Sequence, residues 1–400
     1  QLFKQLLMVG GVERYYQVAR CYRDEDFRAD RQVEFTQLDF EGSFWGQEDV
    51  LETLEKICTA VVSDIRGVEL ATPFERLTYD DAMDRFGTDK PDLRFDMEIV
   101  NLDEVFASTE FNAFAGVLAE GGTVRGINGG ALGLARSGLD GLVSRAQELG
   151  AKGLVWMVVE EDGTLRSPVA KFLSDGELAA IIDALDAGPG DTLLIVADRV
   201  RVVRTVLGEL RLGIGRPEGN DELAFAFVVD FPVFEVDDDG SLAPAHHPFT
   251  APASLDELVN SPATAVSKAY DLVLNGAELG SGSVRIHDPE MQAKVFEVMG
   301  ISDEEAEARF GWFLEALRYG TPPHAGFAIG IDRLVSILQD EPNIREVMPF
   351  PKTQTGADPL TGSPGRVDAA QLAELGIDIR SEVREQWAEE ESGEEDGVDA

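Results

Sequence analysis

The chain has few cysteines, few lysines and no long apolar run. Cys21 and Cys58 are its two cysteines, with no CxxC pair and no nearby histidine cluster, which argues against a disulfide framework or a structural zinc site. No run of eighteen apolar residues occurs, and the first residues lack the basic-then-apolar order of a signal peptide. We therefore expect a soluble, cytoplasmic protein with no membrane partner.

Positive charge is also scarce, because 34 Lys and Arg face 75 Asp and Glu, a formal net charge of -41. Such a surface repels nucleic acid, so a polyanion would have to be bound by local basic residues. Eight lysines accompany 26 arginines. This bias and the surplus of acid fit a hydrated surface adapted to high salt, where electrostatic repulsion has a short range. We interpret the acidity as adaptation to the solvent rather than as a binding function.

Hydrophobic residues make up 44% of the 400 residues, enough for more than one core. The start of the chain predicts a helix over 2–9 and strands over 15–22 and 33–40. Between the strands lie residues 23–31, of which seven are charged. A connection longer than a hairpin turn requires is where function tends to lie. The apolar spacing over 47–67 then predicts a helix that packs on a core.

Changes of composition predict four parts. Residues 1–94 and 220–384 would form the two parts of a core, and 95–219, with Gly-rich turns between short elements, an inserted α+β domain. Residues 385–400 are acidic and poor in apolar side chains, so we expect a disordered tail.

Local signals predict several element boundaries. Thr78 with Asp81 predicts one helix start, and Ser174 with Glu177 predicts another through a capping box. A strand is predicted over 225–234 and a turn over 237–240.

The charged segment and its flanking strands carry residue types that suit the activation of a small acidic substrate by a nucleotide. That chemistry needs cations for carboxylates and an α-phosphate, acids for Mg²⁺ and a flat slot for a base. Arg23 and Glu25 leave one strand, and Phe35 to Asp39 return on the next, where alternate side chains share a face. A salt-bridged hairpin would also explain Arg23 and Glu25, but the whole string favours a functional site.

Two separated strings resemble signature motifs of the class II aminoacyl-tRNA synthetases in their bacterial aspartyl form. RCYRDEDFRADRQVEFTQLDF, from Arg20, resembles the second motif, and GFAIGIDRLVSIL, from Gly326, resembles the third. AHHPFTAP from Ala245 and NGAELGSGSVRIHD from Asn275 follow in that family's order. The resemblance implies an α+β fold in which an antiparallel sheet is flanked by helices. It also implies that the insert is the GAD-type domain shared with tRNA-dependent amidotransferases.

The same resemblance implies an aspartate–tRNA ligase that forms aspartyl-adenylate from L-aspartate and ATP and transfers the aspartyl group to the 3′ end of tRNA(Asp), as a homodimer. The family's N-terminal anticodon-binding domain and first motif have no counterpart in the sequence, so we expect an N-terminally truncated fragment.

Site roles follow from the resemblance, residue by residue. Arg23, at the α-phosphate and the aspartate carboxylate, and Arg333, near the γ-phosphate, are the predicted catalytic residues. Lys4 and Arg285 would neutralise the side-chain carboxylate and so select aspartate over asparagine. The predicted aspartate site comprises Gln1, Lys4, Arg23, Gln37, Asp39, His246 and Arg285. The predicted ATP site comprises Arg23, Glu25, Gln32, Phe35, Glu278, Gly330, Ile331, Asp332 and Arg333.

Two acids, Asp271 and Glu278, resemble the family's Mg²⁺ ligands, and we expect them on one strand or strand-turn. Carboxylates suit this hard ion. Gly280, Gly282 and Gly330 are expected to let substrate approach the backbone closely. Arg28 and Arg31 are candidate contacts to the tRNA acceptor stem.

Three alternatives stay open. A relaxed enzyme that charges both tRNA(Asp) and tRNA(Asn) would show the same residues. An ammonia-dependent asparagine synthetase could use the same core, although the insert and the 23–31 segment count against it. A non-catalytic tRNA-binding relative is disfavoured by the intact set Arg23, Glu278, Arg285 and Arg333.

Overall fold

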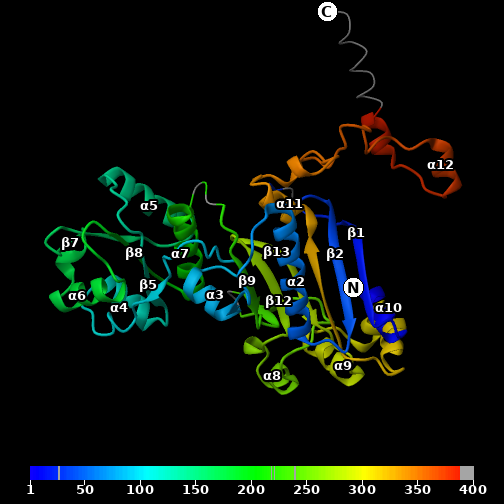
Figure 1. Cartoon of the computed structure of the whole chain (residues 1–400), viewed down its shortest axis with the longest axis horizontal. Coiled ribbons are helices and arrows are strands. Elements are labelled where there is room, and N and C mark those ends of the chain that lie inside the picture. Colours follow the sequence, from blue (N-terminus) through cyan, green and yellow to red (C-terminus); the bar gives the residue numbers. More distant parts are fainter. Residues whose placement is uncertain (26–27, 218, 220, 238–239, 388–400) are drawn as a thin grey trace, which may run out of the picture. The chain divides into compact units, whose positions relative to one another are not determined.

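A computed structural model describes residues 1–25, 28–217, 219, 221–237 and 240–387 (Figure 1). Most of the predicted tail and the middle of the predicted turn at 237–240 lie outside these residues. The chain divides into two compact units, one of residues 1–21 with 35–342, the other of 22–34 with 343 onward.

Seven strands of the described residues form the main sheet, in the order β1-β2-β14-β13-β12-β9-β3. From β2 to β9 the neighbours pair antiparallel, and β3 pairs parallel with β9. This confirms the predicted antiparallel sheet. The strands are β1 (Arg14–Tyr22), β2 (Glu34–Ser43), β3 (Glu75–Thr78), β9 (Phe225–Val229), β12 (Ala269–Leu274), β13 (Ala277–Val284) and β14 (His324–Gly330).

The strand predicted over 225–234 is wrong in its second half. After β9 the chain leaves the main sheet at Asp230, whose φ is 59°, and Pro232 then lacks the N–H that a ladder needs. Phe234 begins a separate short strand, β10 (Phe234–Val236), which pairs with β11 (Leu242–Pro244).

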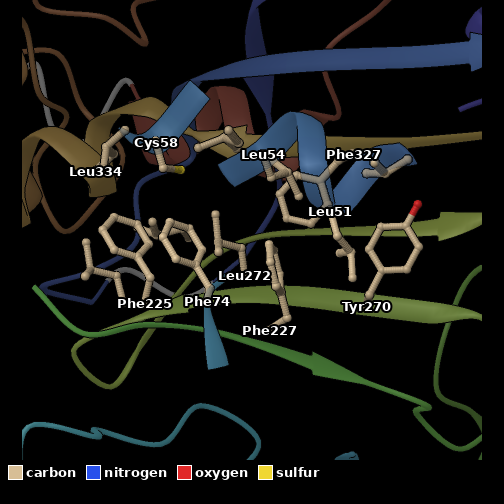
Figure 2. Packing of buried hydrophobic residues seen from close by; sticks show 14 of the residues in the cluster. Leu51, Leu54, Cys58, Phe74, Phe225, Phe227, Tyr270, Leu272, Phe327 and Leu334 are labelled. Carbon is tan, nitrogen blue, oxygen red and sulfur yellow. The ribbon is translucent and has the colours of Figure 1, made fainter. Parts of the chain in front are cut away.

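One face of the main sheet is covered by α2 (Gln47–Arg66), which ends at Gly67 in the left-handed conformation, φ 65°. Figure 2 shows Leu51, Leu54 and Cys58 of this helix pointing toward aromatic and aliphatic side chains of the strands, among them Phe227 and Leu272. Each fully buried side chain of this size stabilises the fold by roughly 1.5–3 kcal/mol. The layer holds the sheet rigid behind the site.

Strand alternation sends the charged residues to the other face. Phe40 and Tyr270 belong to the α2-facing core, so Asp39, Glu41 and Asp271 point away from it. That second face is closed at the β3 end by α3 (Tyr79–Phe86), while α1 (Leu2–Val9) packs against α10 (Asp303–Leu317). Further helices of this unit are α8 (Leu255–Asn260), α9 (Pro289–Val298) and α11 (Ile331–Leu338).

A second sheet lies within residues 100–198, in the order β4-β5-β8-β6-β7, with antiparallel neighbours. A separate hydrophobic cluster packs on each of its faces. This sheet belongs to the same compact unit as the main sheet, so a separate domain over 95–219 remains a prediction. Its elements are β4 (Val100–Asn101), α4 (Asn112–Ala119), β5 (Thr123–Asn128), α5 (Arg136–Glu148), β6 (Val155–Val159), β7 (Leu165–Arg166), α6 (Asp175–Ala184), β8 (Thr192–Asp198) and α7 (Val200–Gly215).

The connection between the two sheets is fixed by buried arginine. Arg211 of α7 is fully buried and donates to the backbone carbonyls of Asp92, Phe95 and Met97, at 2.9 to 3.0 Å. Its guanidinium also lies 4.0 Å from the ring centre of Phe95. A side chain that satisfies several carbonyls of one loop holds that loop against its helix.

Among the helices of the described residues, none combines the length and apolar character needed to span a bilayer.

Candidate active site

A buried cluster of two cations and a carboxylate joins α1, β2 and the end of β13. Arg285 Nε and Nη2 donate to the two carboxylate oxygens of Glu41, at 2.9 and 3.2 Å, and Lys4 Nζ lies 3.1 Å from Glu41 Oε2. The side chains of Glu41, Arg285 and Lys4 are 0, 3 and 8% exposed. Burial opposes the charge on Glu41, but Arg285 and Lys4 outweigh burial and hold the pKa of this carboxyl below its usual range.

Asp39 completes the cluster at its more accessible side. Its Oδ1 accepts from Lys4 Nζ at 2.6 Å, and 20% of its side chain is exposed. Gln37 lies two residues earlier on the same face of β2 and accepts a hydrogen bond from the Cys21 thiol at 3.4 Å. The structure therefore brings Lys4, Asp39 and Arg285 together as the sequence predicted, and it adds Glu41.

The third nitrogen of Arg285 is held by neutral groups. Nη1 donates to Ser283 Oγ at 2.5 Å and to His247 Nε2 at 3.1 Å, and the Gln1 side-chain amide lies 3.0 Å from the same ring nitrogen. The pKa of His247 is lowered to about 2, by desolvation of the ring where it faces Arg285 and then by the charge of Arg285, although the residue as a whole is exposed. A neutral ring can be displaced from Arg285 by an anion without loss of an ion pair.

The side chain of His246, the predicted substrate residue of the HHPF string, packs against Phe231, whereas that of its neighbour His247 contacts Arg285. The ring of His246 packs edge-on against Phe231, 5.4 Å between centres, and its Nε2 has no hydrogen-bond partner among the described residues. Burial lowers its pKa, so it is a neutral side chain. Its role at the substrate remains a prediction, while its neighbour His247 makes the contact to Arg285.

Asp271 and Glu278 lie on neighbouring strands rather than on one strand. A two-residue turn at Asn275 and Gly276, with φ of 52° and 82°, joins β12 to β13, and a bulge between Leu272 and Val273 adjusts the register. The hairpin brings the two carboxylates close enough to interact.

The environment of Asp271 favours a cation. The side chain is 8% exposed, and its Oδ1 has no partner among the described residues. Burial and then the nearby charge of Glu278 raise the pKa of Asp271 well above its usual range. No group of three or more His, Cys, Asp or Glu that could hold a metal occurs in the described residues. An ion here would thus need further ligands from a substrate or water, which is how Mg²⁺ is commonly bound.

The Gly-Ile-Asp-Arg segment passes from β14 into α11. Gly330 precedes the helix, and Ile331, Asp332 and Arg333 form its first turn, all partly exposed. Asp332 Oδ2 accepts from the backbone N–H of Thr36 at 2.6 Å, which ties the helix start to β2 beside Phe35. Arg333 Nη1 donates to the carbonyl of Glu278. These contacts connect three elements that carry predicted ATP residues.

Two of the glycines that were predicted to admit substrate, Gly280 and Gly282, are required by the packing of the sheet. A Cβ on Gly280 would collide with the Ala328 carbonyl and the Phe327 ring, and one on Gly282 would collide with the Gly326 carbonyl and the Tyr270 ring. Both positions therefore serve the packing of the sheet and its aromatic core, and the expectation of substrate contact there remains a prediction. At Gly330 a Cβ would meet nothing closer than 3.4 Å.

The remaining motif residues belong to the second unit. The backbone N–H of Arg23 donates to the Val33 carbonyl at 2.9 Å, and Glu25 pairs with Arg31 at 3.4 Å. Gln32 is buried, and its Oε1 accepts from the N–H of Lys352 at 3.2 Å. Arg28 is exposed. Their roles at ATP or tRNA remain predictions. So does the role of Phe35, which is half-buried and belongs to the first unit.

Glu41, His247 and Ser283 were missed as site residues. For Glu41 a signal existed, since it continues the period-two series of Gln37 and Asp39 on β2. For His247 the sequence offered two adjacent histidines and no means of choosing between them.

An antiparallel sheet with helices on its faces is the architecture of the class II aminoacyl-tRNA synthetases, and not that of a parallel nucleotide-binding domain. The family model for tRNA synthetases class II (D, K and N) matches residues 1–354, and the chain belongs to this family.

Curated relatives carry the name aspartate–tRNA(Asp/Asn) ligase. The protein of Desulfatibacillum aliphaticivorans is 50% identical over 389 residues, 96% of this chain and 65% of that protein. The protein of Thermobifida fusca (strain YX) is 51% identical over 94% of this chain and 66% of its own length. The chain thus spans about two thirds, 65 and 66%, of the length of these relatives. Among solved structures, an aspartyl tRNA synthetase from Entamoeba histolytica matches 90% of this chain and 52% of that chain at 20% identity, with a TM-score of 0.46.

Proposed function

We propose that this chain carries the active site of an aspartate–tRNA ligase, which activates L-aspartate with ATP and transfers it to the 3′ end of tRNA. The observation that supports this most directly is the buried Lys4–Glu41–Arg285 cluster, on the face of the antiparallel sheet that lies opposite α2. Two desolvated cations beside Asp39 suit a substrate with two carboxylates and one amine.

Selection of aspartate follows from the hydrogen bonds of Arg285. Glu41 fixes Nε and Nη2, so the guanidinium cannot turn, while Nη1 is held by Ser283 and His247. A side-chain carboxylate can replace those neutral partners and gain a charge-assisted bond. Asparagine would turn an N–H₂ group toward one of the cations, which leaves a buried donor unpaired and costs affinity.

Adenylate formation needs positioning rather than a covalent enzyme intermediate. The α-carboxylate of aspartate would attack the α-phosphorus in line and release pyrophosphate. Asp271 and Glu278 would hold Mg²⁺, which supplies charge neutralisation at the phosphates. Arg333, tied to Glu278, is proposed at the triphosphate. The proposed roles of Arg23, Glu25, Gln32 and Phe35 at ATP rest on the motif alone.

A relaxed choice of tRNA is the second candidate. The relatives are named for both tRNA(Asp) and tRNA(Asn), and at 50 to 51% identity this favours charging of both. A homodimer is also proposed, since β1 is the edge strand of the main sheet in the described part of the chain and exposes Tyr16 and Val18, at 77 and 61%.

Aminoacylation of tRNA(Asp) and tRNA(Asn) transcripts by the full-length protein, in high KCl with ATP and Mg²⁺, tests the proposal. Aspartate should be attached to tRNA(Asp), and attachment to tRNA(Asn) as well would select the relaxed enzyme. Failure with both transcripts would contradict ligase activity.

A further inference from the structure

His324 lies where the three elements that carry the aspartate cluster meet. It is fully buried at the start of β14 and pairs with Ser43 at the end of β2. Its backbone carbonyl accepts from the N–H of Arg285 at 2.9 Å. Its ring points to α1, where it meets the fully buried side chain of Gln5.

The ring of His324 offers one acceptor to α1. Nδ1 lies 2.8 Å from the Pro322 carbonyl, which can only accept, so Nδ1 carries the proton. Burial lowers the pKa of this ring, which leaves Nε2 as an acceptor. Nε2 lies 3.2 Å from Gln5 Oε1, an arrangement in which two acceptors would face each other. The oxygen and nitrogen of a side-chain amide have nearly the same shape, so we assign the Gln5 N–H₂ group to the position that faces His324. Gln5 then donates to His324 in the neutral state of the ring.

Helix α1 needs an anchor that does not depend on Lys4. It has eight residues and no side-chain N-cap, and helices this short are marginal alone. Lys4, the residue before Gln5, binds Asp39 and Glu41, and these are the contacts with which an incoming carboxylate competes. If Lys4 alone held α1 to the sheet, substrate binding would loosen the helix that presents it.

We propose that Gln5 and His324 are positioning residues for aspartate. Their buried hydrogen bond holds α1 against β14, so that Lys4 and Arg285 converge on the side-chain carboxylate of the substrate. The inference rests on the proposed aspartate activation and adds to it the pair that sets the separation of the two cations.

The test compares the Michaelis constants for aspartate and ATP, in aspartate-dependent ATP–pyrophosphate exchange, for the full-length protein and its variants. Gln5→Leu removes the donor at similar volume. His324→Asn keeps a donor for the Pro322 carbonyl but is too short to reach Gln5. Met8→Leu is the matched control, since Met8 is as buried as Gln5 on the same helix, and the hydrogen bond of its sulfur is to Ser43 Oγ, at 3.1 Å.

Gln5→Leu and His324→Asn should each raise KM for aspartate about tenfold and change KM for ATP less than twofold. The reason is that Lys4 moves with α1 while the residues proposed at ATP stay in place. Met8→Leu should leave both constants unchanged. An unchanged KM for aspartate in Gln5→Leu, or an equal rise for ATP, would overturn the positioning role. Gln5→Leu carries the test if His324→Asn does not fold. Absence of exchange in the unmodified protein would instead overturn aspartate activation itself.

Discussion

Replacing Glu41 by glutamine tests how the substrate-side cluster is held together. Glutamine keeps the shape but removes the charge that Arg285 contacts at 2.9 and 3.2 Å and Lys4 at 3.1 Å. Two buried cations would then share Asp39 alone. Removing one partner of a buried ion pair costs about 3–5 kcal/mol, because the remaining charge stays desolvated. We expect the free energy of unfolding to fall by that amount, and the midpoint of thermal unfolding by roughly 4–6 °C, because the entropy of unfolding grows with the 400 residues of the chain.

Ligand and pH should modify this loss in a defined way. Aspartate should stabilise Glu41→Gln more than it stabilises the wild type, because its carboxylate supplies the missing charge. The pKa of Glu41 is lowered, since Arg285 and Lys4 outweigh burial, so its stabilising effect is present above the usual glutamate pKa of about 4.3 and is lost as the pH falls below it. Stability of the variant should be less sensitive to acid.

Differential scanning calorimetry with and without aspartate measures both effects. Glu48→Gln is the matched control, because Glu48 pairs with Arg76 on the surface at 2.8 and 2.9 Å, an arrangement worth less than about 1 kcal/mol. A loss of stability no greater in Glu41→Gln than in this control would show that Glu41 does not hold the two cations, and equal stabilisation of the variant by asparagine would show that the substrate's charge is not what replaces Glu41.

Three further outcomes are expected. Asp271→Asn should stabilise the metal-free protein by about 1–2 kcal/mol, because the pKa of Asp271 is raised and its ionised form costs stability as the pH rises through that pKa. The same change should abolish Mg²⁺-dependent ATP binding in calorimetry. A variant less stable than the wild type would contradict the first expectation. With a pKa of about 2, His247 stays neutral, so KM for aspartate should show no step from this ring between about pH 5.5 and 8; a step that His247→Gln removes would refute the assignment. Raising KCl from about 0.1 to 2 M should raise the midpoint of thermal unfolding, because screening weakens repulsion within a chain of net charge -41; a falling midpoint would count against adaptation to salt.

Short-range sequence patterns correctly predicted the helices and caps that are determined by interactions between neighbouring residues. The helix over 2–9, the helix from Gln47 and the capping box of Ser174 with Glu177 are confirmed, the last by both reciprocal hydrogen bonds. An Asn-Gly dipeptide at 275–276, a strong hairpin signal, was present in the sequence and would have separated Asp271 from Glu278 onto two strands.

Long-range contacts could not be predicted in this way. Glu41 and Arg285 are 244 residues apart, and their pairing depends on β14 lying between β2 and β13. Gly280 and Gly282 are small because aromatic rings and carbonyls of neighbouring strands lie against them, which no pattern within the β13 segment reveals. The family resemblance supplied Lys4 and Arg285, and the structure supplied the carboxylate that holds them.

Amino-acid-dependent ATP–pyrophosphate exchange by the full-length protein in high KCl, with aspartate, asparagine and glutamate compared, tests most directly that the Lys4–Glu41–Arg285 cluster selects aspartate. We expect exchange with aspartate alone, abolished by Arg285→Ala. Exchange with asparagine at a similar rate, or exchange with aspartate that survives Arg285→Ala, would contradict it.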